Sequence, residues 1–415
     1  MVDSRQRVAG FQAHAPATLV AADAAGWSTA TAPMRSRYCS WLTGAASRAA
    51  IGLLVLVVGM AASCGGDAKP AAPGGATPFV FEATAPSPGV LELLNQVASI
   101  RGLPAPAGLK TAVVSRGQVP ALLEAALTDA DRAWFAHTTT LYRLLGFFKT
   151  DEDYLEVYRE FAGTQVVGLY DPSRKTLFVV ASGDRGFDEL DLAERETLAH
   201  ELAHALQDDS FDLAKIAAGA QQDLDRGLVF GALVEGDAVV TQRLWARRGA
   251  VPVAIGGVML FAAPGPLPAG TPAGIERELR FPYETGATWV QGVRVAGGTA
   301  AVDALFRNLP GGTSVVLHPE LAARGWQPEA VQLPDLAPGL GSGWARESGG
   351  TLGEFTLRNW LQLQLGGLEA ANAATGWSGD HYDVYRSGSE SVAVLRFAFA
   401  AAGERDEFAR AYAKR

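Results

Sequence analysis

Two histidines four residues apart, with a glutamate directly after the first, are the part of this sequence best suited to chemistry. They are His200 and His204, and the glutamate is Glu201. Residues four apart on an α-helix lie about 40° apart and one turn above each other, so both imidazoles can hold one ion. Glu201 lies about 100° further round, where its carboxylate can reach a water on that ion without ligating it. The pattern therefore indicates a catalytic metal site, since a bound ion lowers the pKa of water and a nearby carboxylate can take its proton.

The residues around this pair predict the helix that such a geometry requires. Asp191 and Glu194 have the spacing of a capping box at a helix N-terminus. An apolar stripe at helical spacing follows, made of Leu198, Leu202, Ala205 and Leu206. The alternative is a coincidental match on a surface helix, but a chain with only six histidines gives chance few opportunities to place two of them here. We therefore predict a metal-binding helix that ends near residues 207–210.

A third protein ligand is predicted on a second helix, which we expect over residues 226–247. Glu235 falls on an otherwise apolar stripe of this helix. The apolar members of the stripe are Leu228, Ala232 and Val239. A carboxylate on an apolar face is costly to bury unless it is paired or binds a metal. Residues 205–234 leave enough chain for a turn and a returning antiparallel helix, so the sequence favours His200, His204 and Glu235 as the three ligands.

Two other interpretations of this helix stay open. Glu235 could instead form a salt bridge with an arginine such as Arg226 or Arg243. Asp237 lies two residues further on and points to nearly the opposite side of an ideal helix. It could orient a metal ligand only if a glycine such as Gly236 distorts the helix. We therefore treat Asp237 as a supporting residue and not as a ligand.

This combination resembles the zincin metallopeptidases, whose zinc is held by a His-Glu-x-x-His helix. The metzincin extension His-x-x-Gly-x-x-His is absent, and the resemblance is to the gluzincin arrangement, in which a glutamate is the third ligand. It implies Zn²⁺ bound by His200, His204 and Glu235, with Glu201 as the general base. The fold that we expect is α+β, a mainly helical zincin-like domain with a small antiparallel sheet beside the metal-binding helix.

Further stretches resemble a group of uncharacterised bacterial lipoproteins that carry the same motif. They cover most of residues 165–415. The matching stretches are 200–208, 233–238, 281–283, 316–320 and 376–380. The stretches 200–208 and 233–238, taken together, are specific to this group. Residues 311–315 depart from the more polar stretch expected there, which weakens the match over that segment.

A metallopeptidase also needs a hydrogen-bond donor for the oxyanion of its tetrahedral intermediate. Enzymes of this kind often use a tyrosine or a histidine outside the motif, and Tyr283 and His318 are the available candidates. His318 could instead be a loop residue that fixes the turn at Pro319. Tyr283 could instead be an amphipathic residue of the core. Both are predicted as catalytic candidates, each with its structural alternative.

The N-terminal part of the chain predicts export. Residues 49–62 are apolar and uncharged, which is short for a membrane-spanning helix and typical of the core of a signal peptide. Arginines precede this run at positions 35, 37 and 48. We therefore expect residues 1–63 to be a presequence and signal peptide, and a true start at Met34 would give a signal of ordinary length. The alternative is a short uncleaved anchor.

Residues 61–64 resemble a bacterial lipobox, although Ala61 stands where leucine is usual. The resemblance implies cleavage before Cys64 and a lipid on that cysteine. The protein would then be anchored to the membrane at the cell envelope, on its periplasmic or extracellular face. The only other cysteine, Cys39, lies in the presumed signal, so the mature chain has neither a cysteine nucleophile nor a thiolate metal site.

Composition divides the rest of the chain into a linker and one large domain. Residues 64–89 are rich in proline, alanine and glycine and form the linker. Residues 90–415 form the metallopeptidase-like domain. We expect a helical N-terminal part at 90–163, a zinc-site core at 164–250 and a C-terminal part at 251–415.

Two strand-like runs, 165–170 and 176–180, flank a turn at 171–174 and predict a β-hairpin before the metal-binding helix. In zincins, a sheet edge beside this helix pairs with extended substrate, and by that resemblance the hairpin is the candidate edge. A purely structural hairpin is the alternative. Further on, we expect a glycine loop at 375–381 and a strand at 391–398.

The formal net charge of -9 argues against nucleic acid as the main partner. The predicted function is zinc-dependent hydrolysis of peptide bonds at the bacterial cell envelope, with a peptide or protein as substrate. The alternative, from another class, is an envelope lipoprotein that keeps a zinc site without turnover and acts as a binding or assembly factor. Glu201 favours the enzyme, because a structural zinc site has no use for a base and usually closes its fourth position.

Overall fold

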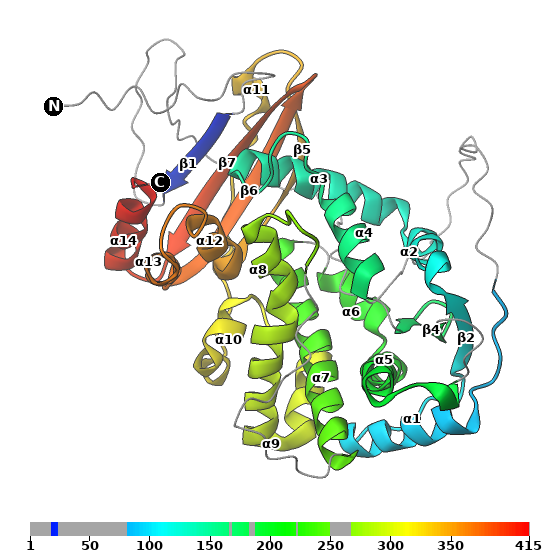
Figure 1. Ribbon diagram of the computed structural model, residues 1–415. Helices are drawn as coiled ribbons and strands as arrows, with labels where there is room; N and C mark the ends of the chain where they lie inside the picture. The colour runs from blue at the N-terminus through cyan, green and yellow to red at the C-terminus, as the bar shows by residue number, and fades with distance from the viewer. Residues whose placement is uncertain are drawn as a thin grey trace.

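The computed structural model describes residues 18–23, 81–165, 168–181, 187–220, 223–249 and 267–414 (Figure 1). These residues form a mainly helical structure with two small sheets, which confirms the predicted α+β class. The predicted signal core, Cys64 and most of the predicted linker lie outside the described residues. Within the described ranges, no helix combines the length and the apolar character needed to cross a bilayer.

The first helix packs on the helix that carries the two histidines. α1 (Pro88–Arg101) begins at Ser87, whose hydroxyl accepts the Val90 N–H, and ends at Gly102, which takes up a left-handed conformation. The buried side of α1 contacts α5 (Leu192–Phe211). The elements between them are β2 (Lys110–Ser115), α2 (Val119–Ala126), α3 (Asp129–Leu145), α4 (Tyr154–Gln165), β3 (Gly168–Asp171) and β4 (Thr176–Ala181).

A three-stranded sheet lies beside α5. β3 and β4 form the predicted antiparallel hairpin, with Tyr170 opposite Leu177. β2 pairs in parallel with β4, so the strand order is β2-β4-β3 and β3 is an edge strand. The sheet is therefore mixed, and not purely antiparallel as expected. The sequence indicated only the hairpin, because β2 lies in residues 90–163, which were predicted to be mostly helical.

Two long helices, α5 and α7 (Leu224–Gly249), carry the predicted metal ligands, and the short helix α6 (Leu213–Ala220) joins them. In Figure 1, α5 is seen nearly end-on while α7 runs along the page. The two helices therefore cross and do not lie antiparallel as the sequence suggested. Residues 227–242 of α7 are buried on every face, so α7 is a central element of the fold.

After α7, the described chain resumes with α8 (Ala273–Phe281), one turn of π-helix at Pro282–Gly286 and α9 (Ala287–Arg307). The π turn packs directly on α7. α9 contains a kink at Gly298, whose φ of 70° lies outside the helical region. The kink divides α9 into two segments of similar length, 287–297 and 299–307. The π turn between α8 and α9 is thus the point where this part of the chain contacts α7.

The C-terminal part of the chain forms a second sheet with short helices around it (Figure 1). Its strands are β5 (Ala345–Gly350), β6 (Trp377–Ser387) and β7 (Glu390–Phe399), which are antiparallel to one another, and β1 (Thr18–Asp23), which is parallel to β7. The helices are α10 (Ser314–Leu317), α11 (Ala337–Leu340), α12 (Gly353–Leu361), α13 (Gly367–Ala374) and α14 (Ala402–Tyr412).

The glycine loop expected at 375–381 is wrong from Trp377 onward, where β6 begins. Asp380, in the middle of this segment, is buried. Its carboxylate accepts the backbone N–H groups of Leu352 and Gly353 and the indole N–H of Trp377. A buried aspartate with three such hydrogen bonds can lie inside a strand, because they replace those it would make with water.

The predicted site lies between two hydrophobic clusters. One cluster surrounds α1, α5 and the hairpin, and the other surrounds α7, α9 and the π turn. A third and larger cluster joins α3, α4 and α12 to the C-terminal sheet. The Trp360 indole N–H of α12 donates to the Leu145 carbonyl of α3 at 2.8 Å within this third cluster. Polar side chains of α5 and α7 therefore meet where the first two clusters adjoin.

Candidate metal centre

The helix that carries both histidines begins and packs as the sequence predicts. Asp191 Oδ1 accepts the Glu194 N–H at 2.9 Å, and the Glu194 carboxylate accepts the Asp191 N–H at 2.9 Å. The predicted apolar stripe is fully buried and consists of Leu198, Leu202, Ala205 and Leu206. With this stripe packed against α1 and the hairpin, the face that carries His200 and His204 is turned toward α7.

The three predicted ligands meet between α5 and α7. Glu235 Oε2 lies 3.0 Å from His200 Nε2 and 3.6 Å from His204 Nε2, and the two Nε2 atoms are 3.1 Å apart. The exposed fraction of the side chain is 12% for His200 and 1% for each of the other two. One ligand atom from each residue lies within 4.8 Å of the others. This buried group could therefore hold a metal ion.

The alternative for Glu235, a salt bridge to an arginine, is not what the structure shows. Its ion pairs within the described residues are with His200 and His204. Burial alone would raise the pKa of Glu235, but the two histidines outweigh burial and lower it, so the carboxylate is ionised. The other oxygen, Oε1, is buried and has no hydrogen-bond partner among the described residues. An ionised carboxylate with an unpartnered buried oxygen fits a metal ligand, because a cation would satisfy it.

Gln207 fixes the tautomer of His204. Its Nε2 donates to the Val234 carbonyl at 3.1 Å, so the amide oxygen must be the atom that faces the ring. Gln207 Oε1 lies 2.9 Å from His204 Nδ1 and accepts its N–H. Burial lowers the pKa of His204, but the charge of Glu235 outweighs burial and raises that pKa to about 9. Once neutral, the imidazole keeps its proton on Nδ1 and presents an unprotonated Nε2. That is the form in which a histidine binds a metal.

Gln242, which lies on α7, orients the His200 ring in the same way as Gln207 orients that of His204. Its Oε1 lies 3.2 Å from His200 Nδ1, and its Nε2 donates to Glu196 at 3.4 Å. Both distances are longer than those around Gln207, and His200 is the more exposed of the two histidines. Both ligands are therefore oriented by a glutamine, and the support of His204 is the tighter and more deeply buried one.

Glu201 is held beside the histidines by the hairpin. Its Oε2 accepts the Tyr170 N–H of β3 at 2.9 Å, and the side chain is buried. The close approach depends on Gly168, where a Cβ would lie 2.7 Å from Leu198 Cδ2 and 3.2 Å from Glu201 Cγ. Burial raises the pKa of Glu201, against the opposing effect of the two histidines. A carboxyl with a raised pKa is suited to proton transfer near neutral pH.

The hairpin is attached to α5 by a second set of contacts. The Tyr170 hydroxyl donates to Asp208 at 2.8 Å, and Lys175 in the turn forms an ion pair with the same carboxylate. Because the Tyr170 N–H is taken up by Glu201, part of the β3 edge is already engaged. The use of this edge by a substrate stays a prediction, while its role in placing Glu201 is seen directly.

Tyr283 lies at the site, on the π turn. Its ring is stacked on that of His200, with centroids 6.4 Å apart and planes at 24°. Burial, followed by the charges of Glu235 and Glu201, raises the pKa of Tyr283 well above its usual value. The phenol therefore keeps its proton and is available as a hydrogen-bond donor. Of the two predicted oxyanion donors, this one is brought to the metal ligands.

Two glycines let the π turn reach this position. A Cβ on Gly236 of α7 would lie 2.6 Å from the carbonyl carbon and oxygen of Gly286. A Cβ on Gly286 would in turn lie 2.5 Å from the carbonyl oxygen of Ala232. The helix and the turn therefore touch backbone to backbone, next to Glu235. Single π turns inside helices are frequent at functional sites, where they re-aim a side chain.

His318 is not brought to the metal ligands. Its Nε2 lies 2.6 Å from Glu354 Oε1, and the Ser314 hydroxyl donates to the other oxygen of the same carboxylate. The hydrogen bond to Glu354 raises the pKa of His318. Among the described residues, no hydrogen bond or ion pair joins His318 to Glu201 or to the three ligands. These contacts favour the alternative, in which His318 fixes the local chain.

Tyr158 of α4 is a residue near the site that the sequence did not single out. Its hydroxyl is buried and has no hydrogen-bond partner within the described residues. Burial, and next the charge of Glu235, raises the pKa of Tyr158. Nothing in the sequence separates it from the core aromatics around it, such as Phe135, whose ring is 5.4 Å away.

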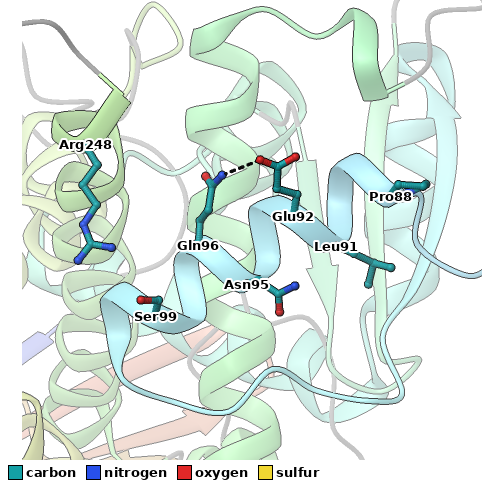
Figure 2. Close-up of a pocket in the computed structure, with 7 residues that line it drawn as sticks. All are labelled: Pro88, Leu91, Glu92, Asn95, Gln96, Ser99 and Arg248. Atoms are coloured by element: carbon teal, nitrogen blue, oxygen red, sulfur yellow. Dashed lines mark hydrogen bonds between the residues drawn. The ribbon is translucent and has the colours of Figure 1, made fainter.

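A surface pocket of about 690 Å³ lies elsewhere, on the outer face of α1. It extends from Pro88 to Ser99, and Arg248 of α7 lies at one end (Figure 2). Gln96 donates to Glu92 within it at 3.2 Å. None of the metal ligands lines this pocket, and the opposite side of α1 is the one that faces α5. This pocket is therefore separate from the three candidate ligands.

Residues 343–415 match a protein family described as a domain of unknown function (DUF8575). That segment contains β5, β6, β7 and the helices α12 to α14, but none of the predicted catalytic or metal-binding residues. No curated protein and no solved structure matches the chain significantly. An account of its chemistry therefore rests on the geometry of its own residues.

Proposed function

We propose that the chain is a zinc-dependent metallopeptidase. His200, His204 and Glu235 would hold the metal, and Glu201 would act as the general base. The observation that carries the proposal is the buried ligand group with a separately held carboxylate beside it. Two imidazole nitrogens and one carboxylate oxygen suit zinc and leave a coordination position for water or substrate. When bound, zinc would polarise the substrate carbonyl and lower the pKa of water.

The protein residues around that position have separate tasks. Glu201 would take a proton from the attacking water and deliver it to the leaving amine, and the Tyr170 N–H holds the carboxylate in place for this transfer. Tyr283, protonated and stacked on His200, would donate a hydrogen bond to the oxyanion that develops on the substrate. The buried walls of α5 and α7 would limit the access of bulk water, which strengthens these electrostatic interactions.

The proposal extends to location and substrate on the strength of the sequence. We propose a peptide or protein substrate at the cell envelope, with the chain anchored by a lipid on Cys64. Mass spectrometry of the protein extracted from membranes should show an N-terminus at Cys64 with acyl chains attached, and Cys64→Ser should abolish the attachment. An unmodified Cys64, or an N-terminus upstream of it, would contradict this part of the proposal.

The second candidate function is a lipoprotein that binds zinc without turnover. The glutamine supports of both histidines would serve a structural site equally well, because they bear on metal affinity alone. Glu201 distinguishes the two functions, since it is not one of the three grouped ligands and is nevertheless held beside them at a cost in burial. A carboxylate in that position contributes to water activation and contributes little to a closed structural site.

The test is cleavage of unfolded proteins by the purified chain loaded with zinc. New termini are identified by mass spectrometry in ¹⁸O-labelled water, which marks each carboxyl group produced by hydrolysis. Glu201→Gln should keep about one zinc per chain and lose cleavage by roughly 10²–10⁴-fold, the range typical of general-base catalysis. Glu284→Gln is the matched control, because this glutamate lies on the same π turn as Tyr283 but is exposed. Zinc-loaded protein that cleaves no member of a broad substrate set would favour the non-catalytic lipoprotein.

A further inference from the structure

A buried arginine is connected to the metal ligands from α1. Arg101, the last residue of α1, has a side chain with no exposed surface. Its Nε lies 2.6 Å from Asp237 Oδ2 of α7, and its Nη2 lies 2.7 Å from Asp303 Oδ1 of α9. A guanidinium removed from water is costly unless it is paired. The arginine therefore stays only because both carboxylates face it.

Asp237 connects Arg101 to the candidate ligand His204 through Gln207. The oxygen that accepts from Arg101, Oδ2, also accepts Gln207 Nε2 at 3.0 Å. Gln207 Oε1 in turn accepts the Nδ1–H of His204 at 2.9 Å. Four residues from three helices thus form one buried chain of contacts, from Arg101 through Asp237 and Gln207 to His204.

Asp237 and the Val234 carbonyl together decide which way the Gln207 amide faces, because Gln207 Nε2 donates to both. Asp237 Oδ2 already accepts from Arg101 Nε, so the amide nitrogen of Gln207, and not its oxygen, faces Oδ2 at 3.0 Å. A flipped amide would present its nitrogen to His204 Nδ1 and would accept no ring proton. It would then favour the tautomer with the proton on Nε2, the atom directed at Glu235. Arg101 holds the Asp237 carboxylate in place and so stabilises the metal-binding tautomer of His204.

We infer that Arg101 and Asp237 are positioning residues that set the metal affinity of the site through Gln207. The inference rests on the metal site of the proposed function and does not depend on the reaction carried out there. It also gives α1 a task beyond packing, because the arginine at its C-terminal end acts on a ligand 103 residues later in the chain (204 minus 101). The competing explanation is that Arg101 merely ties α1 to α7 and α9.

The two explanations differ in what a substitution does to zinc binding by the full chain. The dissociation constant is measured by competition with a chelator of known affinity, and the metal-free protein is unfolded in parallel to record stability. Arg101→Met should weaken zinc binding by roughly 10–100-fold, the usual effect of losing an outer partner of a metal-bound histidine. If Arg101 only joins helices, the metal-free protein will be less stable while its zinc affinity, measured under folding conditions, will not change. That result would overturn the inference.

A double-mutant cycle identifies the route, and the second histidine provides the matched control. In a Gln207→Met background the chain of contacts is already cut, so Arg101→Met should cause little further loss of affinity. In a Gln242→Met background, which removes the support of His200 instead, Arg101→Met should retain its full effect. Losses that multiply independently in both backgrounds would show that the arginine does not act through Gln207, and the inference would fail.

A second variant and a comparison with peptide hydrolysis complete the test. If Arg101→Met yields no folded protein, Arg101→Lys takes its place. Its ammonium keeps a charge near Asp237 but lacks the planar fork, so the same pattern is expected with a weakening of about three- to tenfold. Unaltered affinity in Arg101→Lys together with independent losses for Gln207→Met would count against the inference. A zinc-binding wild type that shows the coupling but hydrolyses no peptide would refute the proposed function and leave this inference standing.

Discussion

The contact between α7 and the π turn can be tested by adding a single methyl group. In Gly236→Ala, the new Cβ would lie 2.6 Å from Gly286 C and O and 2.9 Å from Ala287 N. These are backbone atoms, which cannot rotate away as a flexible side chain would. Ordinary contact begins at 3.4 Å, so the helix and the turn must separate by about 0.8 Å (3.4 minus 2.6). The substitution therefore forces apart the two elements that carry Glu235 and Tyr283.

The expected magnitude follows from two opposing effects. Overpacking of a closely fitted contact costs about 1–3 kcal/mol. Alanine is favoured over glycine inside a helix by about 1 kcal/mol, which offsets part of that cost. The free energy of unfolding of metal-free Gly236→Ala should thus fall by roughly 0–2 kcal/mol. Gly292→Ala on α9 is the matched control, because a Cβ there meets nothing within 4 Å and only the helix-propensity gain applies.

Urea unfolding in the presence of a chelator measures both variants against the wild type. The transition midpoint should move down or stay level for Gly236→Ala and should move up for Gly292→Ala, with unchanged slopes. The difference between the two variants isolates the packing cost of about 1–3 kcal/mol. Zinc should also stabilise Gly236→Ala less than it stabilises the control, because Glu235 is the neighbouring residue. If both alanine variants are stabilised to the same degree, the backbone contact described here is not a real constraint.

Three further outcomes are expected. Tyr283→Phe keeps the stacked ring but removes the donor, so kcat should fall by roughly 10²–10³-fold with little change in KM, and steady-state kinetics with an unchanged kcat would exclude the oxyanion role. Chelation should lower the thermal midpoint, and zinc at about 100 times its Kd should restore roughly 2.7 kcal/mol of stability, whereas a midpoint indifferent to both would argue against the site. Burial raises the pKa of Asp223 to about 6, so the native state binds its proton more tightly than the unfolded chain and the free energy of unfolding falls as pH rises from about 4 to 6. Asp223→Asn keeps an acceptor for the Arg226 N–H. Denaturation curves taken between about pH 4 and 6 should show that the variant loses about 1–3 kcal/mol less unfolding free energy over this range than the wild type. An equal loss in both proteins would contradict the raised pKa of Asp223.

The three candidate metal ligands could be predicted from the sequence because each obeys a local rule. His200 and His204 are fixed by helix periodicity, and the capping residue Asp191 confirms where that helix begins. Glu235 follows from the cost of burying a carboxylate on an apolar stripe, and its side chain is indeed 1% exposed. The prediction that α5 and α7 lie antiparallel was wrong, since the spacing of ligands along two helices does not fix the angle at which the helices cross.

The residues around the ligands were harder to predict, for different reasons. Gln207 follows the histidine motif among polar residues that suggested the end of a helix, yet α5 continues to Phe211 and Gln207 is fully buried. Tyr283 reaches the site through a π turn and through a backbone contact at Gly236, neither of which has a periodic signature. His318 showed the opposite difficulty, because a histidine beside a proline looks the same in sequence whether it faces a substrate or the carboxylate of Glu354.

Asp237 shows what can and cannot be predicted from the rule that a buried carboxylate needs a partner. An ideal helix points Asp237 away from Glu235, but the far side of α7 does not meet solvent. Residues 227–242 of α7 are instead buried all round, so the rule that identified Glu235 as a ligand applies to Asp237 as well and requires a partner for it. The rule cannot name that partner, which is Arg101, 136 residues away in the chain. No distortion of α7 is needed, because Gln207 spans the distance to His204 that Asp237 cannot reach by itself.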